Sequence, residues 1–333
     1  MSALGEALGK LTPDTQASGS MLPALRGINP YMTPNDCLVR AFNAIDREGQ
    51  PYVEKPREYI EAADWGNKTE KLILAETARR LGVEADLEIT RPYQHPLLPL
   101  AVSLDGIAQG NGATFRTDPD RKIYVIGRDE IELDGPGILE AKLTGAAASP
   151  HPAPYRGPIQ VAGAMMCTGF KWAAIGTLYR GTELRIYLLA PEPSETAKIE
   201  ADVLDFQRRL DGYRNHGDRD WYPALSPNDA ASIYSWADSG EPPIALDDEL
   251  SQLALEYSDA CKAERALAKL KTEITTRIMD AMGPHEQAEI YEEGAKVGEV
   301  SWKTNKARSE YVVQARPAAR AKSIQVKIYG EDD

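Results

Sequence analysis

Cysteine and histidine are scarce in this chain of 333 residues. The three cysteines, Cys37, Cys167 and Cys261, lie far apart without metal-ligand spacing, which argues against a disulfide framework and a zinc site. The four histidines are scattered, so chemistry centred on histidine is poorly supported. No stretch approaches the roughly 20 apolar residues of a membrane span, and no secretory signal opens the chain. We therefore expect a cytoplasmic protein with no membrane partner.

Positive charge is also in short supply. The chain has 38 Lys and Arg residues against 51 Asp and Glu residues, a formal net charge of −13. Such a balance is unusual for a protein that contacts phosphates, although an acidic protein can still line one channel with basic residues. The segment 303–333 holds seven basic and four acidic residues, which gives 7 − 4 = +3. This basic tail either lies along DNA or a partner, or is a solvated strand with a flexible end.

A tripeptide of acid, spacer and lysine occurs twice, as Asp120-Arg121-Lys122 and as Glu140-Ala141-Lys142. The first copy follows turn-forming residues, so we expect it in a solvated loop. The second lies in the apolar run Ile138–Leu143, which predicts a strand. Alternate side chains of a strand share a face, so Glu140 and Lys142 point the same way. The second copy is either an exposed charge pair or part of a metal site that faces a phosphodiester.

A further carboxylate is expected close to this strand. The run Leu100–Ala108 predicts one strand, in which Ala101, Ser103 and Asp105 share a face of small residues. Such a face has room for a metal ion or a DNA backbone. A buried carboxylate is costly unless it is paired or bound to a metal, so Asp105 is a candidate ligand.

A third carboxylate, that of Glu70, lies on a predicted helix that begins near Trp65 and ends near Leu81. Glu70 falls at helical spacing with Leu74 and Ala78 on the apolar stripe of this helix. An acid in that position is unexpected. It either stabilises the first turn through the helix dipole or belongs to a functional site.

Gln160 lies early in the predicted helix Ile159–Phe170. It begins a stripe of small residues that continues through Gly163, Ala164 and Cys167. The stripe allows a close approach of the helix backbone, either to the sheet or to a bound nucleic acid.

The motifs follow one another in the order Ser20, Gly27–Pro34, Gly66 with Glu70, Asp105-Gly106, Glu140-Ala141-Lys142 and Gln160. This order resembles the YqaJ-type viral recombinase family, the branch of the PD-(D/E)XK nucleases that includes the exonuclease of phage lambda. The resemblance covers roughly residues 18–190. Single motifs are weak signals, but their order and spacing together are fairly specific.

The resemblance implies a role for each motif. Asp105 and Glu140 would be metal ligands, with the backbone carbonyl of Ala141 completing the site. Lys142 would orient or activate the attacking water and stabilise developing charge. Glu70 would support the metal site or the water. Gln160 would position the lysine or the scissile phosphate. Contacts to the DNA end would be made by Ser20, Tyr31 and Thr33.

The implied activity is that of a Mg²⁺-dependent exonuclease on double-stranded DNA ends, with Mn²⁺ as a substitute ion. Carboxylate and carbonyl oxygens are the ligands that Mg²⁺ prefers. The implied partners are double-stranded DNA, a single-strand annealing protein and further copies of the chain in a trimeric ring, in a phage or prophage system of a bacterial cell. Two alternatives stay open: an endonuclease or repair nuclease on the same scaffold, and a non-catalytic module that binds a DNA end or a partner.

The expected fold class is α/β, with a restriction-endonuclease-like core of one mixed central sheet flanked by helices and an α+β C-terminal extension. Residues 1–17 are expected to be a flexible N-terminus, 18–214 the core, 215–245 a linker or surface loop, and 246–333 a long helix, a hairpin and the basic tail. Further predicted elements are strands at 87–91, 122–131, 173–179 and 184–189, a helix at 194–214 capped by Ser194, a helix at 246–282, and a hairpin formed by 288–291 and 296–302.

Overall fold

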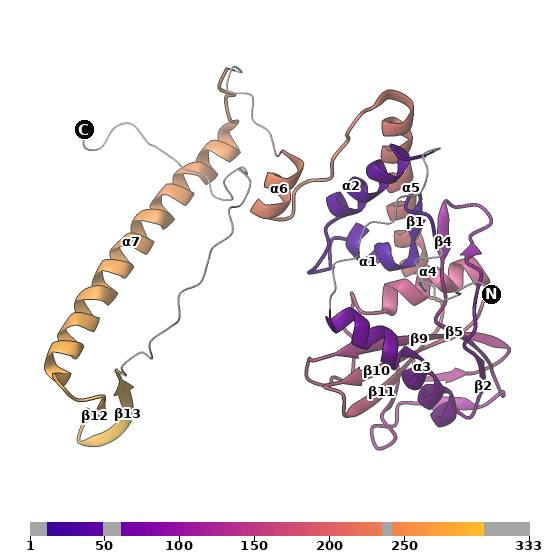
Figure 1. Ribbon diagram of the computed structural model, residues 1–333, viewed down its shortest axis with the longest axis horizontal. Coiled ribbons are helices and arrows are strands. Elements are labelled where there is room, and N and C mark those ends of the chain that lie inside the picture. The colour runs from indigo at the N-terminus through magenta and orange to yellow at the C-terminus, as the bar shows by residue number, and fades with distance from the viewer. Residues whose placement is uncertain (1–11, 49–60, 235–241, 303–333) are drawn as a thin grey trace, which may run out of the picture. The chain divides into compact units, whose positions relative to one another are not determined.

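The computed structural model describes residues 12–48, 61–234 and 242–302, without the side chains of residues 62 and 63. The chain forms two compact units, Met1–Ile233 and Tyr234–Asp333, which we describe separately (Figure 1). The basic tail at 303–333 and most of the predicted N-terminal segment lie outside the described residues.

The first unit is built on a mixed sheet of six strands in the order β2-β5-β9-β10-β11-β7. The long strand β9 is central, because it pairs antiparallel with β5 on one side and parallel with β10 on the other. The strand bounds are β2 Glu84–Asp86, β5 Gly106–Gln109, β7 Ile123–Val125, β9 Pro136–Thr144, β10 Ala173–Tyr179 and β11 Glu183–Leu189. The predicted fold class, a mixed central sheet flanked by helices, is confirmed.

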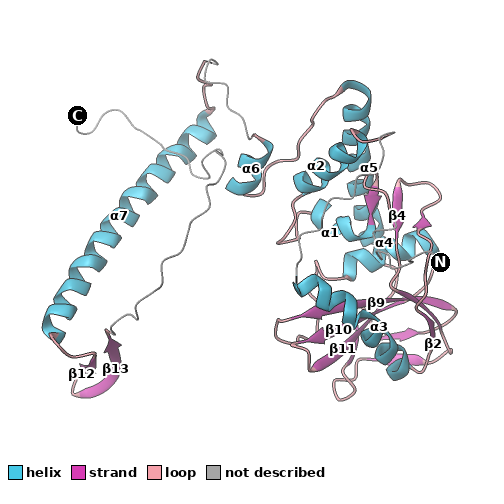
Figure 2. Ribbon diagram, viewed as in Figure 1, coloured by secondary structure: helices cyan, strands magenta, loops and turns pink. Residues whose placement is uncertain are grey.

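Helices α3 (Glu61–Leu81) and α4 (Pro158–Thr168) cover the two faces of this sheet (Figure 2). Leu139 of β9 packs in one apolar cluster with Leu74 of α3, whereas Ile138 packs in another with Val161 of α4. Because side chains alternate along a strand, Glu140 and Lys142 share the face of Ile138. The sequence pattern of β9 therefore places its charged pair beneath α4.

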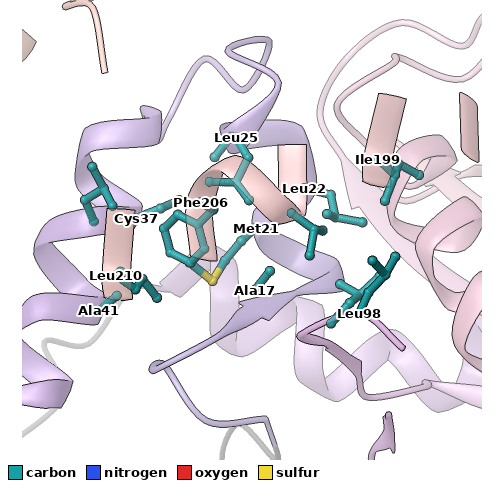
Figure 3. Packing of buried hydrophobic residues seen from close by; sticks show 14 of the residues in the cluster. Ala17, Met21, Leu22, Leu25, Cys37, Ala41, Leu98, Ile199, Phe206 and Leu210 are labelled. Atoms are coloured by element: carbon teal, nitrogen blue, oxygen red, sulfur yellow. The ribbon is translucent and has the colours of Figure 1, made fainter. Parts of the chain in front are cut away.

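A second layer packs on the outer side of α4. It contains helices α1 (Leu22–Leu25), α2 (Pro34–Ile45) and α5 (Pro193–His216), the short helix η1 (Gly19–Met21), and a small sheet in the order β1-β4-β3. The strands of this sheet are β1 Ala17–Ser18, β4 Leu100–Val102 and β3 Tyr93–Gln94. Met21, Leu22 and Phe206 fill the core between these elements (Figure 3). This layer fixes η1 and β4 beside the end of α4 that carries Gln160.

The predicted strand Leu100–Ala108 is wrong, because two strands of different sheets occupy it. β4 pairs with β1 and β3, whereas β5 pairs with β2 and β9. Residues 103–105 cross from one sheet to the other. Asp105 therefore lies in a bend directly before β5, and the expected face that it shares with Ala101 and Ser103 does not exist.

Three other local predictions differ from the structure. The segment 87–91 forms no strand, since Asp86 accepts a hydrogen bond from the backbone of Glu88 and turns the chain after β2. The segment 122–131 is interrupted by a turn at Gly127, whose φ is 75°; the following strand β8 (Glu130–Glu132) pairs with β6 (Thr114–Arg116). Ser194 caps no helix, because α5 begins at Pro193, whose missing N–H suits the first helical position.

Part of the predicted linker 215–245 is folded onto the core. α5 continues to His216, and a helix α6 (Pro227–Ile233) follows. Asp229 of α6 is 5 % exposed and accepts hydrogen bonds from Asn35 and from the backbone of Leu225. At the other end of the unit, Ala17 is buried and pairs with Leu100, so the expected flexible N-terminus stops before it.

The second unit contains a long helix and a hairpin, as predicted. Helix α7 (Asp248–Met282) begins after Asp247, whose side chain accepts from the Leu250 backbone at 2.8 Å. Strands β12 (Gln287–Glu292) and β13 (Ala295–Ser301) pair antiparallel. Over the described residues, none of the helices has the length and apolar character needed to cross a membrane.

Candidate active site

The Glu140–Lys142 pair is buried at the centre of the sheet. The Glu140 side chain is only 3 % exposed and that of Lys142 is 23 % exposed. The Lys142 ammonium donates one hydrogen bond to Glu140 Oε1 and another to Gln160 Oε1, the latter at 3.1 Å. This burial rules out the alternative of an exposed charge pair. The hydrogen bond from Lys142 to Gln160 joins β9 to α4.

Asp105 approaches the same point from the bend before β5. Its Oδ2 accepts a hydrogen bond from the backbone N–H of Ala141 at 3.0 Å, and its negative charge is close enough to Glu140 to raise the pKa of that carboxyl group. In an extended strand the N–H and C=O of one residue point to the same edge. The Ala141 carbonyl thus points to the edge of β9 on which Asp105 lies, as the predicted ligand set requires.

Without a bound cation, the carboxyl groups of Asp105 and Glu140 both have raised pKa values. Burial, followed by the neighbouring Asp105 carboxylate, raises the pKa of Glu140 to about 8. Burial is also the main cause of the raised pKa of Asp105, which Lys142 only partly offsets. Two adjacent buried carboxyls with one ammonium leave an excess of negative charge, which a proton or a bound cation neutralises.

Lys142 keeps its proton. Burial alone would lower the pKa of this amine, but Glu140 and Asp105 outweigh that effect and raise the pKa above its usual value. The side chain is therefore a cation at neutral pH. Of the two roles that the sequence left open, charge stabilisation is favoured over proton abstraction.

Glu70 belongs to the same site although it lies on the opposite helix. Burial raises the pKa of its carboxyl group, and the negative charge of Asp105 adds to this effect. The predicted stripe of α3 is confirmed, since Leu74 and Ala78 are buried. Glu70 lies beyond the buried part of this stripe, and its half-buried side chain reaches the cleft described next.

A cleft of about 350 Å³ is lined by the three carboxyl-bearing residues and by Gln160, whereas Lys142 and Ala141 are not among its lining residues. Five of the predicted site residues line it, namely Ser20, Glu70, Asp105, Glu140 and Gln160. Sequence reasoning missed Thr12, Asn67 and Ser103, which also line it. The hydroxyl of Ser103 is buried and has no hydrogen-bond partner among the described residues. Its position two residues before Asp105 is the only sequence signal that pointed to it.

Two residues predicted to contact DNA lie elsewhere. Thr33 is the N-cap of α2: its hydroxyl accepts from the Asp36 backbone at 3.1 Å and donates to Asp229 at 2.9 Å. The sequence Thr33-Pro34-Asn35-Asp36 has the pattern of a capping box, so this structural role was readable from the sequence. Tyr31 is exposed and lies against Arg156 rather than in the cleft.

The small-residue stripe of α4 is explained by packing. A Cβ atom at Gly163 would lie 2.4 Å from Leu22 Cδ1, so any other residue there would force the buried Leu22 side chain to move. Ala164 is buried, and Cys167 contacts the backbone of Leu100. The stripe thus positions Gln160 through helix packing, and it needs no nucleic acid to account for it.

The donor set fits a hard divalent cation. The Asp105 carboxyl and the Ala141 carbonyl lie on the same edge of β9, and the Glu140 carboxyl is close enough to Asp105 for the two charges to interact. Mg²⁺ prefers such oxygens and keeps several waters besides. The described part of the chain has no group of three or more His, Cys, Asp or Glu side chains suited to holding a metal ion. The side chains of Asp105, Glu140 and Glu70 therefore do not form one compact group of three acidic ligands.

No protein-family model matches the chain, and no curated protein does. The structure is similar to an alkaline exonuclease from Laribacter hongkongensis, with 13 % identity and a TM-score of 0.44 over 61 % of this chain and 92 % of that one. It is also similar to a phage-related exonuclease from Haemophilus somnus 129PT, with 14 % identity and a TM-score of 0.38 over 61 % and 96 %. At such low scores, the geometry of the site itself has to carry the functional interpretation.

Proposed function

We propose that the chain is a Mg²⁺-dependent deoxyribonuclease that hydrolyses phosphodiester bonds at the Glu140–Lys142 site. The observation that carries the proposal is the burial of this pair against Asp105 and Gln160, which together with Glu140 line a cleft. Asp105, Glu140 and the Ala141 carbonyl would hold a Mg²⁺ ion, which when bound would supply positive charge at the phosphate and lower the pKa of a water molecule.

Lys142 supplies a second positive charge to the scissile phosphate. An ammonium group has three N–H donors, and two of them are directed to Glu140 and Gln160. The third is left for a phosphate oxygen. Since the ammonium is fixed by two acceptors before substrate arrives, little reorganisation is needed when negative charge develops.

The remaining cleft residues complete the assignment. Gln160 positions Lys142 through the 3.1 Å hydrogen bond. Glu70 is half-buried across the cleft and holds a water molecule on the side opposite α4. Ser20 is exposed at the cleft and contacts the DNA end. Thr33 receives no role in DNA binding, because capping of α2 already uses its hydroxyl.

The order of the motifs extends the proposal to an exonuclease that acts on duplex ends. In that account the product is a single strand, which an annealing protein takes up in phage-type recombination. Mn²⁺ is expected to substitute for Mg²⁺, since both ions accept oxygen ligands.

The test is a time course with the full chain on linear duplex labelled at either end and on closed circular duplex, each with Mg²⁺ or with EDTA. We expect release of label from the linear duplex only, and only with Mg²⁺. Cutting of the circular duplex would instead show an endonuclease. Binding of linear duplex without any cutting would leave a non-catalytic module.

A further inference from the structure

An arginine and two tyrosines from distant parts of the chain form a cluster beside the proposed active site. The Arg156 guanidinium lies 5.4 Å from the ring centroid of Tyr155 and 6.0 Å from that of Tyr31. It donates to the Tyr31 hydroxyl at 3.4 Å, across 125 positions of sequence. The two rings meet edge to face, with centroids 6.2 Å apart.

This cluster is fixed to the two elements that carry the proposed active site. Arg156 Nη1 donates to the backbone carbonyl of Leu143 at 3.3 Å, and Leu143 directly follows Lys142 on β9. Two residues after Arg156, the helix that carries Gln160 begins at Pro158. The guanidinium is thus hydrogen-bonded to the backbone of the residue next to Lys142, about one strand residue (roughly 3.3 Å of rise) along β9.

The charge of Arg156 is not neutralised by an acid. Its hydrogen bonds run to two tyrosine hydroxyls and one backbone carbonyl, and the described residues give it no ion pair. Arg26, by contrast, is paired with both Glu195 and Asp202. In a chain with a net charge of −13, an arginine that keeps its full charge beside the proposed active site is suited to an anionic ligand.

The aromatic partner is open to a flat ligand. The Tyr31 side chain is 76 % exposed, and its backbone N–H is held by Asn29 Oδ1 at 2.9 Å, so the ring projects from an anchored turn. Exposed aromatic rings combined with arginine form the usual platform for unpaired nucleobases, because every base has a face that stacks.

We propose that Tyr31, Tyr155 and Arg156 form a subsite for one nucleotide of an unpaired DNA strand. A base stacks on Tyr31, and the guanidinium of Arg156 binds the adjoining phosphate. The subsite rests on the proposed nuclease function for its meaning, since it holds the strand next to the bond at Lys142. It extends that function by joining Tyr155 and Arg156 to Tyr31, for which the sequence predicted a contact with the DNA end, as residues that hold the strand without taking part in the chemistry.

The test is binding of a fluorescent oligothymidylate to the full chain in EDTA, followed by anisotropy over a salt series. We expect Tyr31→Ala to weaken binding about 5- to 100-fold, the usual cost of losing one stacked base, and Tyr31→Phe to bind nearly as the parent does. Arg156→Gln should weaken binding and reduce the slope of log K against log salt by about 0.7, as loss of one single-strand phosphate contact requires.

The matched control is Arg128→Gln. Arg128 is an exposed arginine on the turn before β8, and it donates a hydrogen bond to the Pro191 carbonyl at 3.5 Å. This variant should keep both the affinity and the salt slope of the parent. Thermal melting of every variant checks the fold, because Arg156 also ties its loop to β9.

The subsite is overturned if Tyr31→Ala and Arg156→Gln bind oligothymidylate with the parent's affinity and slope, or if they only lower the melting temperature. Cleavage of linear duplex by the same variants separates the two proposals. If the variants cleave at the parent's rate and bind with the parent's affinity, only the proposed subsite is rejected. Absence of Mg²⁺-dependent cleavage in the parent removes the nuclease function, and the binding series still decides whether a strand is held here.

Discussion

The chain contains the same acid-spacer-lysine pattern at two places, and the structure treats them differently. Glu140-Ala141-Lys142 lies on the central strand, with a carboxyl group that is 3 % exposed. Asp120-Arg121-Lys122 lies in a turn, where Lys122 has a φ of 60° and reaches Glu183 only at 3.9 Å. Burial raises the pKa of Glu140 to about 8. The same local pattern thus forms a buried site with a raised carboxyl pKa in one place and a solvated loop in the other.

The difference shows that residues from other elements, packed around the tripeptide, decide whether it forms a buried polar site. Around Lys142 a helix supplies Gln160 and a chain crossing supplies Asp105. Around Lys122 the surroundings are other exposed charges, whose interactions water screens. Substitutions at the two patterns therefore test the account in matched pairs.

The largest expected effect is on cleavage. Lys142→Ala should lower the rate of Mg²⁺-dependent cleavage of linear duplex by at least about 10²- to 10³-fold, the usual cost of removing a preorganised charge-stabilising group. Lys122→Ala, which removes the same charge from the loop, should stay within about twofold of the parent. Initial rates at saturating DNA measure both.

Equal rates for the two lysine variants would contradict the comparison. Melting temperatures accompany the rates, since loss of Lys142 leaves Glu140 without its cation. An inactive Lys142→Ala variant that keeps a cooperative melting transition places the loss in the chemistry.

The next effect is a pH-dependent stabilisation by Mg²⁺. At 100 times its dissociation constant a ligand adds about 2.7 kcal/mol, which for a unit of this size raises the melting temperature by roughly 5–10 °C. Because the pKa of Glu140 is raised to about 8, the metal displaces a proton at neutral pH. The rise should therefore be larger at pH 9 than at pH 6. Scanning calorimetry at the two pH values measures it.

The same shift has a definite sign without metal. Between pH 4.5, the ordinary pKa of a glutamate, and about pH 8, the folded state binds more protons at Glu140 than the unfolded state does. The contribution of this group to stability therefore falls as the pH rises through that window. Glu140→Gln should remove both the pH dependence and the Mg²⁺ response, whereas Asp120→Asn should retain both. A Mg²⁺ response that survives in Glu140→Gln would place the metal elsewhere.

The smallest effect concerns a positioning residue. Gln160→Ala removes the 3.1 Å acceptor of Lys142 and should lower kcat about tenfold, the value of one hydrogen bond to a charged group. KM should change little, because the lysine keeps its charge. A change confined to KM would assign Gln160 to DNA binding instead.

Much of the site was visible in the sequence because its signals are local. The apolar run around Glu140 predicted a strand, and the helical spacing of Glu70 with Leu74 predicted an acid on the apolar stripe of a helix. Both features depend only on periodicity along one element. The long helix α7 and its stop at Gly283 were predicted on the same grounds.

The missing parts depend on pairings between distant segments. The alternation of Leu100–Ala108 continues through the crossing at Ser103, so only the separate partners of β4 and β5 reveal the break that positions Asp105. The contact of Arg156 with Tyr31 spans 125 positions and leaves no local trace.

The most direct test of the central claim compares the parent with Glu140→Gln and Asp120→Asn on end-labelled linear duplex in Mg²⁺. The account predicts that the parent and Asp120→Asn release label at similar rates and that Glu140→Gln releases none while still folding. Release of label by Glu140→Gln at the parent's rate would contradict it.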